Sequence, residues 1–226
     1  MSLSRRSLGR LAAALGVAAV LATSLPALAA DPRVKFVTTE GEFVVELYPD
    51  KAPKTVENFL QYVNDKFYDG TIFHRVIKNF MVQGGGFDKD YKQKATRPPV
   101  AYEGRDALAK GLKNVTGSLA MARTDKPDSA TAQFFINVVD NARLDPILIP
   151  PGDPVTIEFR GQVYKDIPRA DVINHPDLFG YTVFGKVVSG MDTIEKIRNL
   201  PTGAAGKFVT DVPQKQVVIE SATLLP

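Results

Sequence analysis

Residues 131–139 alternate between two chemically different faces, and this alternation restricts the fold more than any other feature of the chain. The even-numbered positions from 132 to 138 are all apolar, whereas the odd-numbered positions place Phe135 between the amides of Gln133 and Asn137. Successive residues of a strand point to opposite sides of a sheet. The segment therefore predicts a strand with one face in a core and the other on a wet groove with an apolar floor, which favours a closed barrel or a sandwich.

Other short segments supply the remaining strands of such a fold. Segments 34–37, 43–47, 118–122, 181–188 and 216–220 are rich in β-branched and aromatic residues. Residues 73–85 predict a strand, a loop at Lys78–Asn79 and a second strand, and the glycines at 84–86 predict a turn. Apolar residues recur with helical period in 50–66 and 191–197, which predicts two helices that cap the open ends of the barrel. We expect a mostly β protein.

The composition is that of an ordinary soluble domain, and it excludes several kinds of site. The 226 residues, 44% of them apolar, suit one large domain or two small ones. The absence of cysteine excludes disulfides and thiolate metal sites, and the two histidines lack the spacing of a zinc site. Without the three arginines of the N-terminal segment, the 28 basic residues fall to 25 and match the 25 acidic ones. This balance gives no sign of nucleic-acid binding.

The first 29 residues have the pattern of a cleavable export signal. Three arginines precede an apolar stretch at 11–25 that is short for a membrane span, and residues 27–29 form a small-x-small cleavage site. We expect the mature chain to begin at Ala30, with contact with the membrane only during export. The pair Arg5-Arg6 resembles a twin-arginine signal, although general export signals also contain such pairs, so the route stays open. An uncleaved membrane anchor is the less favoured alternative.

Two polar stretches interrupt the strands. Residues 87–117 predict a long loop with one helical turn near 106–109. Residues 145–180 contain six of the 16 prolines, and within them two β-type segments flank Arg160-Gly161 as a small hairpin. We interpret 145–180 as an insertion in a single domain at 30–226. It is either structural variation or a lid or partner surface beside a binding site.

Five sequence blocks carry a family resemblance. They are APKTVENF at 52–59, FHRVI with FMVQGG at 73–85, GSLAMAR at 117–123, QFFIN at 133–137 and VFGKV at 183–187. In this order they resemble the cyclophilins, the cyclosporin-binding type of peptidyl-prolyl cis-trans isomerase, and most of all the exported bacterial subgroup. The resemblance implies a closed eight-stranded antiparallel barrel capped by two helices, and a location in the periplasm. It covers the chain from about residue 34 to the C-terminus apart from the insertion.

The resemblance also implies roles for individual residues. Arg75 corresponds to the catalytic arginine, with Gln83 and Phe80 beside it. The implied partners are proline-containing unfolded or exported polypeptides, bound by a monomer without cofactor or metal. The implied substrate-binding residues are Met81, Phe135 and Leu144 around the proline, Gln133, Ala122 and Arg123 along its main chain, and Tyr181 at the edge.

The sequence departs from the family beside this pocket. Arg143 stands where many cyclophilins have tryptophan and bacterial ones often have phenylalanine, a ring that supports cyclosporin binding. An arginine makes cyclosporin binding doubtful. It also brings a second positive charge near the pocket, with Asp145 as its expected local partner. The insertion follows directly, so this wall of the pocket is where the protein is expected to differ from its relatives.

Simpler interpretations remain for some of these residues. Without the family resemblance, Arg75 would be interpreted as an ordinary surface arginine on an edge strand. Phe80 and Met81 would both reach a pocket only with a twist or bulge after 78–79, because neighbours in a regular strand face opposite sides. His74 is expected to be structural and hydrogen-bonded, since rotation of an X–Pro bond needs no acid or base. For the whole protein, the alternative is a proline-motif binding or chaperone module on the same fold, with incidental turnover.

Overall fold

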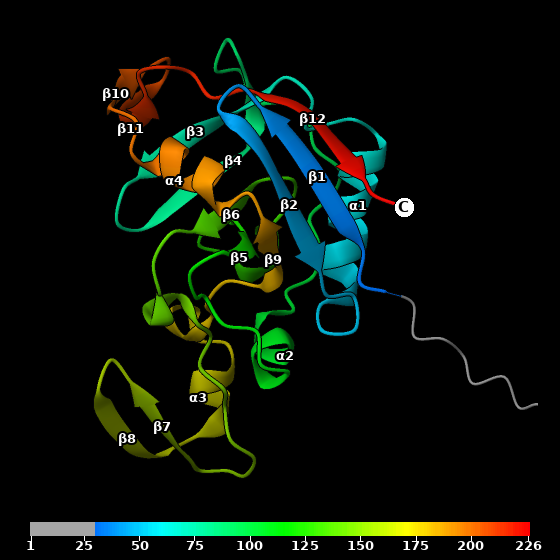
Figure 1. The fold of residues 1–226 in the computed structure, drawn as a ribbon. Coiled ribbons are helices and arrows are strands. Elements are labelled where there is room, and N and C mark those ends of the chain that lie inside the picture. Colours follow the sequence, from blue (N-terminus) through cyan, green and yellow to red (C-terminus); the bar gives the residue numbers. More distant parts are fainter. Residues whose placement is uncertain (1–29) are drawn as a thin grey trace, which may run out of the picture. The chain divides into compact units, whose positions relative to one another are not determined.

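The computed structural model describes residues 30–226, so the export signal predicted at 1–29 lies outside the described residues. Eight strands form one antiparallel sheet in the order β12-β1-β2-β9-β5-β6-β4-β3 (Figure 1). This confirms the predicted mostly β, eight-stranded fold. The strands are β1 (Arg33–Thr38), β2 (Gly41–Leu47), β3 (Thr71–Ile77), β4 (Met81–Asp88), β5 (Ser118–Met121), β6 (Phe134–Asn137), β9 (Val183–Ser189) and β12 (Ile219–Leu224).

The two outermost strands of this order, β3 and β12, approach each other and nearly close the sheet into a barrel. Ile72 of β3 forms an isolated bridge with Val218, and the main-chain N–H of Phe73 donates to the Val217 carbonyl at 3.0 Å. The closing strand predicted at 216–220 is therefore displaced in the structure. Its first half makes these bridging contacts, and the regular strand β12 begins only at Ile219.

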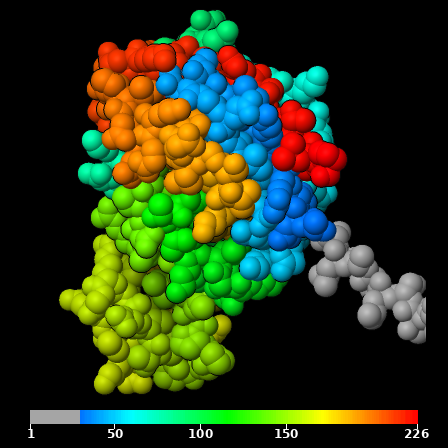
Figure 2. Space-filling model, viewed as in Figure 1, coloured from blue at the N-terminus to red at the C-terminus, as the bar shows by residue number. Residues whose placement is uncertain are grey.

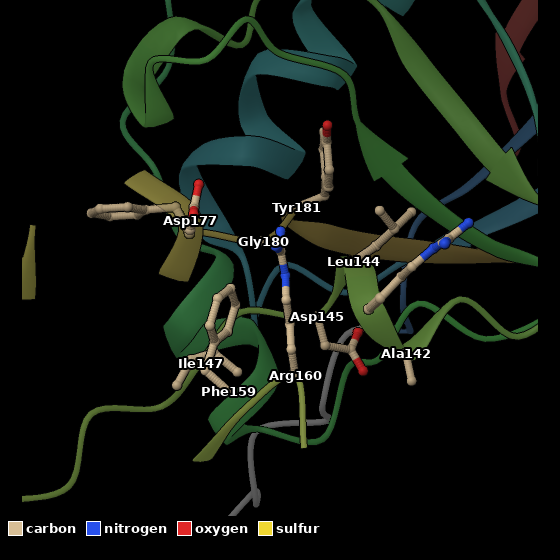
Figure 3. A pocket seen from close by; sticks show the side chains of 11 residues that line it. Ala142, Leu144, Asp145, Ile147, Phe159, Arg160, Asp177, Gly180 and Tyr181 are labelled. Atoms are coloured by element: carbon tan, nitrogen blue, oxygen red, sulfur yellow. The ribbon is translucent and has the colours of Figure 1, made fainter. Parts of the chain in front are cut away.

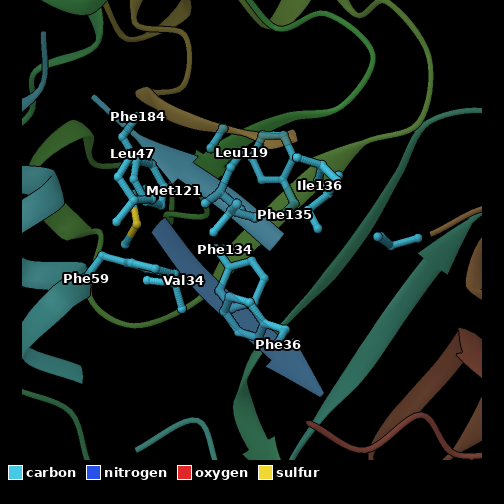
Figure 4. Close-up of a cluster of buried hydrophobic side chains, with 14 of the residues drawn as sticks. Val34, Phe36, Leu47, Phe59, Leu119, Met121, Phe134, Phe135, Ile136 and Phe184 are labelled. Carbon is cyan, nitrogen blue, oxygen red and sulfur yellow. The ribbon is translucent and has the colours of Figure 1, made fainter. Parts of the chain in front are cut away.

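Aromatic side chains from the inward faces of the strands fill the barrel (Figure 4). Phe36 and Phe43 stack with their ring centroids 4.8 Å apart, and Phe134 lies 5.6 Å from Phe36. Phe59 enters from helix α1 (Pro53–Asn64) and lies 5.1 Å from Phe184. These five rings are 0–1% exposed. Burial of each contributes about 1.5–3 kcal/mol, so the barrel is a rigid support for residues on its outer face.

The N-terminus of α1 is capped from a distant part of the chain. Pro53 occupies the first helical turn, where its missing N–H costs nothing, but no side chain of that turn provides a cap. Instead, the buried carboxylate of Glu103 accepts hydrogen bonds from the main-chain N–H groups of Lys54 at 3.1 Å and Thr55 at 2.8 Å. A carboxylate also suits the partial positive charge of a helix N-terminus. This contact ties α1 to the polar loop at 87–117.

Four α-helices occur within residues 30–226, whereas two are predicted. Of the predicted helices, α1 and α4 (Met191–Arg198) both contribute buried side chains to the barrel core. The predicted helical turn is present as α2 (Gly104–Ala109), and α3 (Arg169–Ile173) is too short to give a periodic signal. None of the helices in this range is long and apolar enough to cross a membrane. Three short 3-10 helices complete the list: η1 (Pro127–Ser129), η2 (Ala142–Leu144) and η3 (Pro176–Leu178).

Two further differences concern the strands next to the candidate site. The prediction of a turn at 84–86 is wrong, because all three glycines lie inside β4. There Gly85 has a φ of +79°, and the pairing of β4 with β3 shifts register. No strand is predicted for 202–213, where the structure has a hairpin of β10 (Thr202–Ala205) and β11 (Phe208–Pro213). Glycine and alanine dominate β10 and carry little β signal. The hairpin packs against β3.

The insertion folds around a small cluster of its own. The predicted hairpin is present as β7 (Val155–Phe159) and β8 (Gln162–Ile167). Figure 2 shows the insertion, in yellow-green, packed together at one end of the folded molecule and not at a chain terminus. Arg105 of α2 holds it there: Nε donates to the Ile147 carbonyl at 3.1 Å and Nη1 to the Ile173 carbonyl at 2.8 Å. The buried side chains of the cluster are Val155, Ile157, Val172 and Leu178.

Candidate active site

Strand register places three of the predicted site residues in one row on the outside of the barrel. Arg75 of β3 lies opposite Gln83 of β4, and Gln83 lies opposite Phe135 of β6. The neighbouring row is Val76, Val82 and Ile136, which are 0–1% exposed and face the core. Because side chains alternate along each strand, the first row must face outward. The alternation predicted for residues 131–139 therefore continues across three adjacent strands.

Phe80 and Met81 both reach the same face, although they are adjacent in sequence. Phe80 lies in the turn before β4, so strand alternation does not apply to it, whereas Met81 is the first residue of the strand. Asn141 holds the turn by donating Nδ2–H to the Phe80 carbonyl at 2.9 Å. The turn at 78–80 thus provides the irregularity that the sequence requires for both side chains to contribute.

Leu144 and Tyr181 bring the two ends of the insertion together beside this face. The main-chain N–H of Tyr181 donates to the Leu144 carbonyl at 2.9 Å. Gly180 permits this approach, because a Cβ there would lie 2.3 Å from that carbonyl oxygen. The Tyr181 ring then packs edge-on against Phe135 at 5.4 Å. The return of the chain from the insertion therefore fixes one wall of the site.

Arg123 is occupied by structural contacts. Its guanidinium donates to the carbonyls of Phe179 at 2.6 Å and Gly180 at 3.1 Å, and it lies 4.8 Å from the centre of the Tyr181 ring. The adjacent Ala122 donates its main-chain N–H to the Gln133 carbonyl at 2.9 Å. The Arg123 side chain therefore supports the wall of the site and holds the end of the insertion.

These residues surround a cavity of about 140 Å³, which we call the site cavity. Of the ten predicted site residues, only Gln133 does not line it. Gln133 instead accepts a hydrogen bond from Nε2 of Gln83 at 3.1 Å and orients that amide. Gly86 leaves the space for the Gln133 side chain, since a Cβ there would lie 2.4 Å from its Cγ. The lining residues are Arg75, Phe80, Met81, Gln83, Ala122, Arg123, Phe135, Leu144 and Tyr181.

Asp211 is a neighbour of the site that the sequence did not reveal. Its carboxylate Oδ2 lies 4.0 Å from Nε of Arg75, and it belongs to β11 of the unpredicted hairpin. The two side chains are 29% and 46% exposed, so solvent weakens the attraction between them. Arg75 also lines the site cavity. No sequence motif marks Asp211, because only the folded hairpin brings it to Arg75.

His74 lies behind Arg75 and faces away from the site cavity. The buried ring packs 4.6 Å from Phe87 and 5.3 Å from Phe208, and its Nδ1 has no hydrogen-bond partner within the described chain. Burial lowers its pKa to about 4, and the charges of Arg75 and Lys207 act in the same direction. The expectation of a structural residue agrees with this packing. The imidazole is neutral at pH 7.

The expected pairing of Arg143 with Asp145 does not occur. Asp145 turns away, and its Oδ1 accepts hydrogen bonds from the main-chain N–H of Asn114 at 2.7 Å and from its side-chain amide at 2.9 Å. Buried amide groups at Asn114 bind the Asp145 carboxylate in place of Arg143. The sequence did not indicate this contact. Arg143 lies 5.9 Å from the centre of the Phe80 ring and makes no ion pair within residues 30–226.

The geometry suits binding of a compact apolar group next to a polar backbone. Rings and aliphatic side chains form the floor, while Arg75 and Gln83 project donors along one edge. A permanent positive charge at the edge of such a cavity can stabilise charge or a lone pair that appears during a reaction. Within residues 30–226, no three His, Asp or Glu side chains are grouped so that they could hold a metal ion.

Comparisons with known proteins agree with this geometry. Residues 33–224 match the family described as cyclophilin type peptidyl-prolyl cis-trans isomerase/CLD. Peptidyl-prolyl cis-trans isomerase B of Escherichia coli (strain K12) is 46% identical over 191 residues, 84% of this chain and 98% of the relative. Peptidyl-prolyl cis-trans isomerase A of Dickeya dadantii is 46% identical over 217 residues, 95% and 96% of the two chains. A Cryptosporidium parvum cyclophilin structure, 24% identical, shares the fold with a TM-score of 0.56 over 87% of this chain and 98% of its own.

Proposed function

The chain belongs to the cyclophilin-type peptidyl-prolyl cis-trans isomerases and is an enzyme of that class, and on this premise we propose that Arg75 is its catalytic residue. One observation carries the proposal: Arg75 and Gln83 lie side by side in register at the edge of the site cavity, to which Phe80, Met81 and Phe135 contribute apolar side chains. The proline ring of the substrate occupies that cavity. Its amide then lies against the two polar side chains.

The reaction is a rotation about the amide bond before proline, with a barrier of roughly 18–20 kcal/mol. At the top of the barrier the amide is twisted, its resonance is lost, and the proline nitrogen is pyramidal with a free lone pair. Arg75 donates a hydrogen bond to that lone pair. The planar ground state has no such lone pair, so this contact strengthens only in the transition state and lowers the barrier. His74 takes no part, since the step transfers no proton.

The remaining residues hold the substrate while the amide turns. Phe80, Met81, Phe135 and Leu144 anchor the proline ring, and the Gln83 amide, oriented by Gln133, binds the neighbouring carbonyl. A gain of five decades in rate requires about 7 kcal/mol. A hydrogen bond to a charged group contributes about 1.5–3 kcal/mol, so anchoring and partial removal of water must supply the rest.

We further propose that the substrates are exported polypeptides in the periplasm. The support is the pattern of the first 29 residues: arginines, an apolar stretch and a small-x-small cleavage site. Detection of the mature chain, beginning at Ala30, in a periplasmic extract would support this location. Recovery of the uncleaved chain in the cytoplasm or membrane fraction would contradict it.

The test of the catalytic proposal is Arg75→Ala, assayed on an X-Pro peptide by protease-coupled isomerisation. Arg75 is half exposed, so we expect the unfolding temperature to stay within a few degrees while kcat/KM falls at least about 100-fold. Near wild-type turnover would refute the assignment. The alternative is a proline-motif binding module with incidental turnover. It predicts that the wild type binds the peptide but isomerises it slowly. Cyclosporin affinity is a separate measurement that tests the departure at position 143. Because Arg143 replaces an aromatic ring, we expect this affinity to be weak.

A further inference from the structure

A second and larger cavity adjoins the site cavity on the side of the insertion (Figure 3). Its volume is about 510 Å³, and we call it the insertion cavity. Leu144 and Tyr181 line both cavities, so the two cavities share a wall. Barrel-side residues 142–145 form one wall. The opposite wall comes from the insertion and includes Ile147, Phe159 and Arg160.

Arg160 projects into this cavity from the β7–β8 turn. Figure 3 shows its side chain running from the turn toward Gly180, between Asp145 and Phe159. The guanidinium lies 4.8 Å from the Phe159 ring and forms no ion pair with any residue in 30–226. The turn is held in place, because the hairpin packs on the buried cluster of the insertion and Arg105 ties that cluster to α2. An exposed cation that makes no ion pair among the described residues therefore faces an open cavity.

The two cavities together carry a positive excess, although residues 30–226 are balanced overall. Residues 30–226 contain 25 basic and 25 acidic side chains. The lining of the two cavities has four arginines, at 75, 123, 143 and 160, against two aspartates, Asp145 and Asp177. The insertion cavity alone has two of each, so the excess comes from the two arginines of the site cavity. Oδ1 of Asp145 accepts two hydrogen bonds from Asn114. Arg143 lies at the border of the two cavities, next to Phe80. A concave surface with an excess of one sign of charge raises the local concentration of ligands of the opposite sign.

We propose that the insertion cavity is a substrate subsite for an acidic side chain within two residues of the isomerised proline, with Arg160 and Arg143 as its charge partners. The proposal rests on the proposed function, because it needs the proline in the site cavity. An extended peptide advances about 3.3 Å per residue, so a side chain one or two positions away reaches the shared wall at Leu144 and Tyr181. Ile147 and Phe159 cover the aliphatic part of a glutamate while the guanidinium groups bind its carboxylate.

The test compares short peptides that contain one proline and carry Glu, Gln or Lys at one other position. That position is varied from two residues before the proline to two residues after it. Turnover is measured by NMR exchange, which places no restriction on the residue after proline. We expect kcat/KM for Glu to exceed that for the isosteric Gln by about 3- to 10-fold at one position, and Lys to be the poorest. The advantage of Glu is expected to shrink in 0.5 M salt because screening weakens exposed charge pairs.

Two variants of Arg160 decide whether this residue is responsible. Arg160→Ala is expected to bring the Glu-to-Gln ratio close to one, and Arg160→Glu to make Lys better than Gln. Lys165 on β8 is a matched control: it is exposed, belongs to the same hairpin and does not line the cavity. Lys165→Ala is expected to keep the wild-type ratio.

Several results would overturn the proposal. One is a Glu-to-Gln ratio of kcat/KM equal to one at every position in the wild type, and another is an unchanged ratio in Arg160→Ala. A third is a fall of this ratio in Lys165→Ala as large as in Arg160→Ala, which would indicate general charge attraction. The Gln peptides separate this outcome from failure of the proposed function. If wild type turns them over and Arg75→Ala does not, the catalytic assignment stands whatever the ratio.

Discussion

Acid should destabilise this protein through His74, whose buried ring stays neutral in the folded state. Burial lowers its pKa to about 4, against 6.5 for an exposed imidazole. The unfolded chain therefore binds the proton more tightly than the folded one. Above pH 6.5 both states are neutral and the stabilising contribution is fully present. It is lost as the pH falls from 6.5 toward 4.

The size of the effect follows from the two pKa values. At pH 5 the unfolded imidazole is almost fully protonated and the folded one is mostly neutral, so the difference lowers the free energy of unfolding by about 2 kcal/mol. Below pH 4 the loss approaches about 3 kcal/mol. Carboxylates also titrate in this range. A comparison with His74→Gln, which has no titrating group at this position, isolates the histidine.

The assay is urea unfolding at pH 7.5 and 5.0, followed by far-UV circular dichroism because the chain has no tryptophan. The wild type should lose about 2 kcal/mol more between the two pH values than His74→Gln does. The variant's lower stability at pH 7.5 does not affect this comparison. Equal losses in the two proteins, or an NMR titration that places the pKa of His74 above 6, would refute the reasoning.

Two further predictions concern the groups that orient Gln83 and Arg75. Gly86→Ala puts a Cβ 2.4 Å from Cγ of Gln133, so that side chain must move and release Gln83. We expect kcat/KM to fall about 3- to 10-fold with little change in the unfolding temperature, and unchanged kcat/KM would show that the amide pair is dispensable. Asp211→Asn removes the carboxylate 4.0 Å from Arg75. We expect kcat to fall about two- to fivefold with KM nearly constant. A loss of stability without a loss of kcat would leave Asp211 a purely structural role.

Strand alternation made much of the site predictable. The parity of Gln133, Phe135 and Asn137 separated a groove face from a core face, and the structure extends that face to Arg75 and Gln83. The requirement for an irregularity before Met81 was also correct, because the turn at 78–80 provides it. These inferences succeeded because strand geometry is local and has a period of two.

The errors concern contacts between distant parts of the chain. Asp145 binds Asn114, 31 residues away, and not its neighbour Arg143. Glu103 caps a helix that begins 50 residues earlier in the chain. Asp211 approaches Arg75 only because a glycine- and alanine-rich segment pairs as a hairpin. Periodicity and propensity do not contain such information, since each contact depends on the completed barrel.

The central claim is that Arg75 binds the twisted amide better than the planar one, and Arg75→Lys tests it most directly. Lysine keeps the charge but lacks the rigid fork of donors. NMR exchange on a single X-Pro peptide gives both the peptide Kd and kcat. Our account predicts that kcat falls about 30- to 100-fold, equivalent to about 2–3 kcal/mol, while Kd changes less than about twofold. A parallel loss in Kd and no change in kcat would show that Arg75 binds the ground state, and would contradict the mechanism.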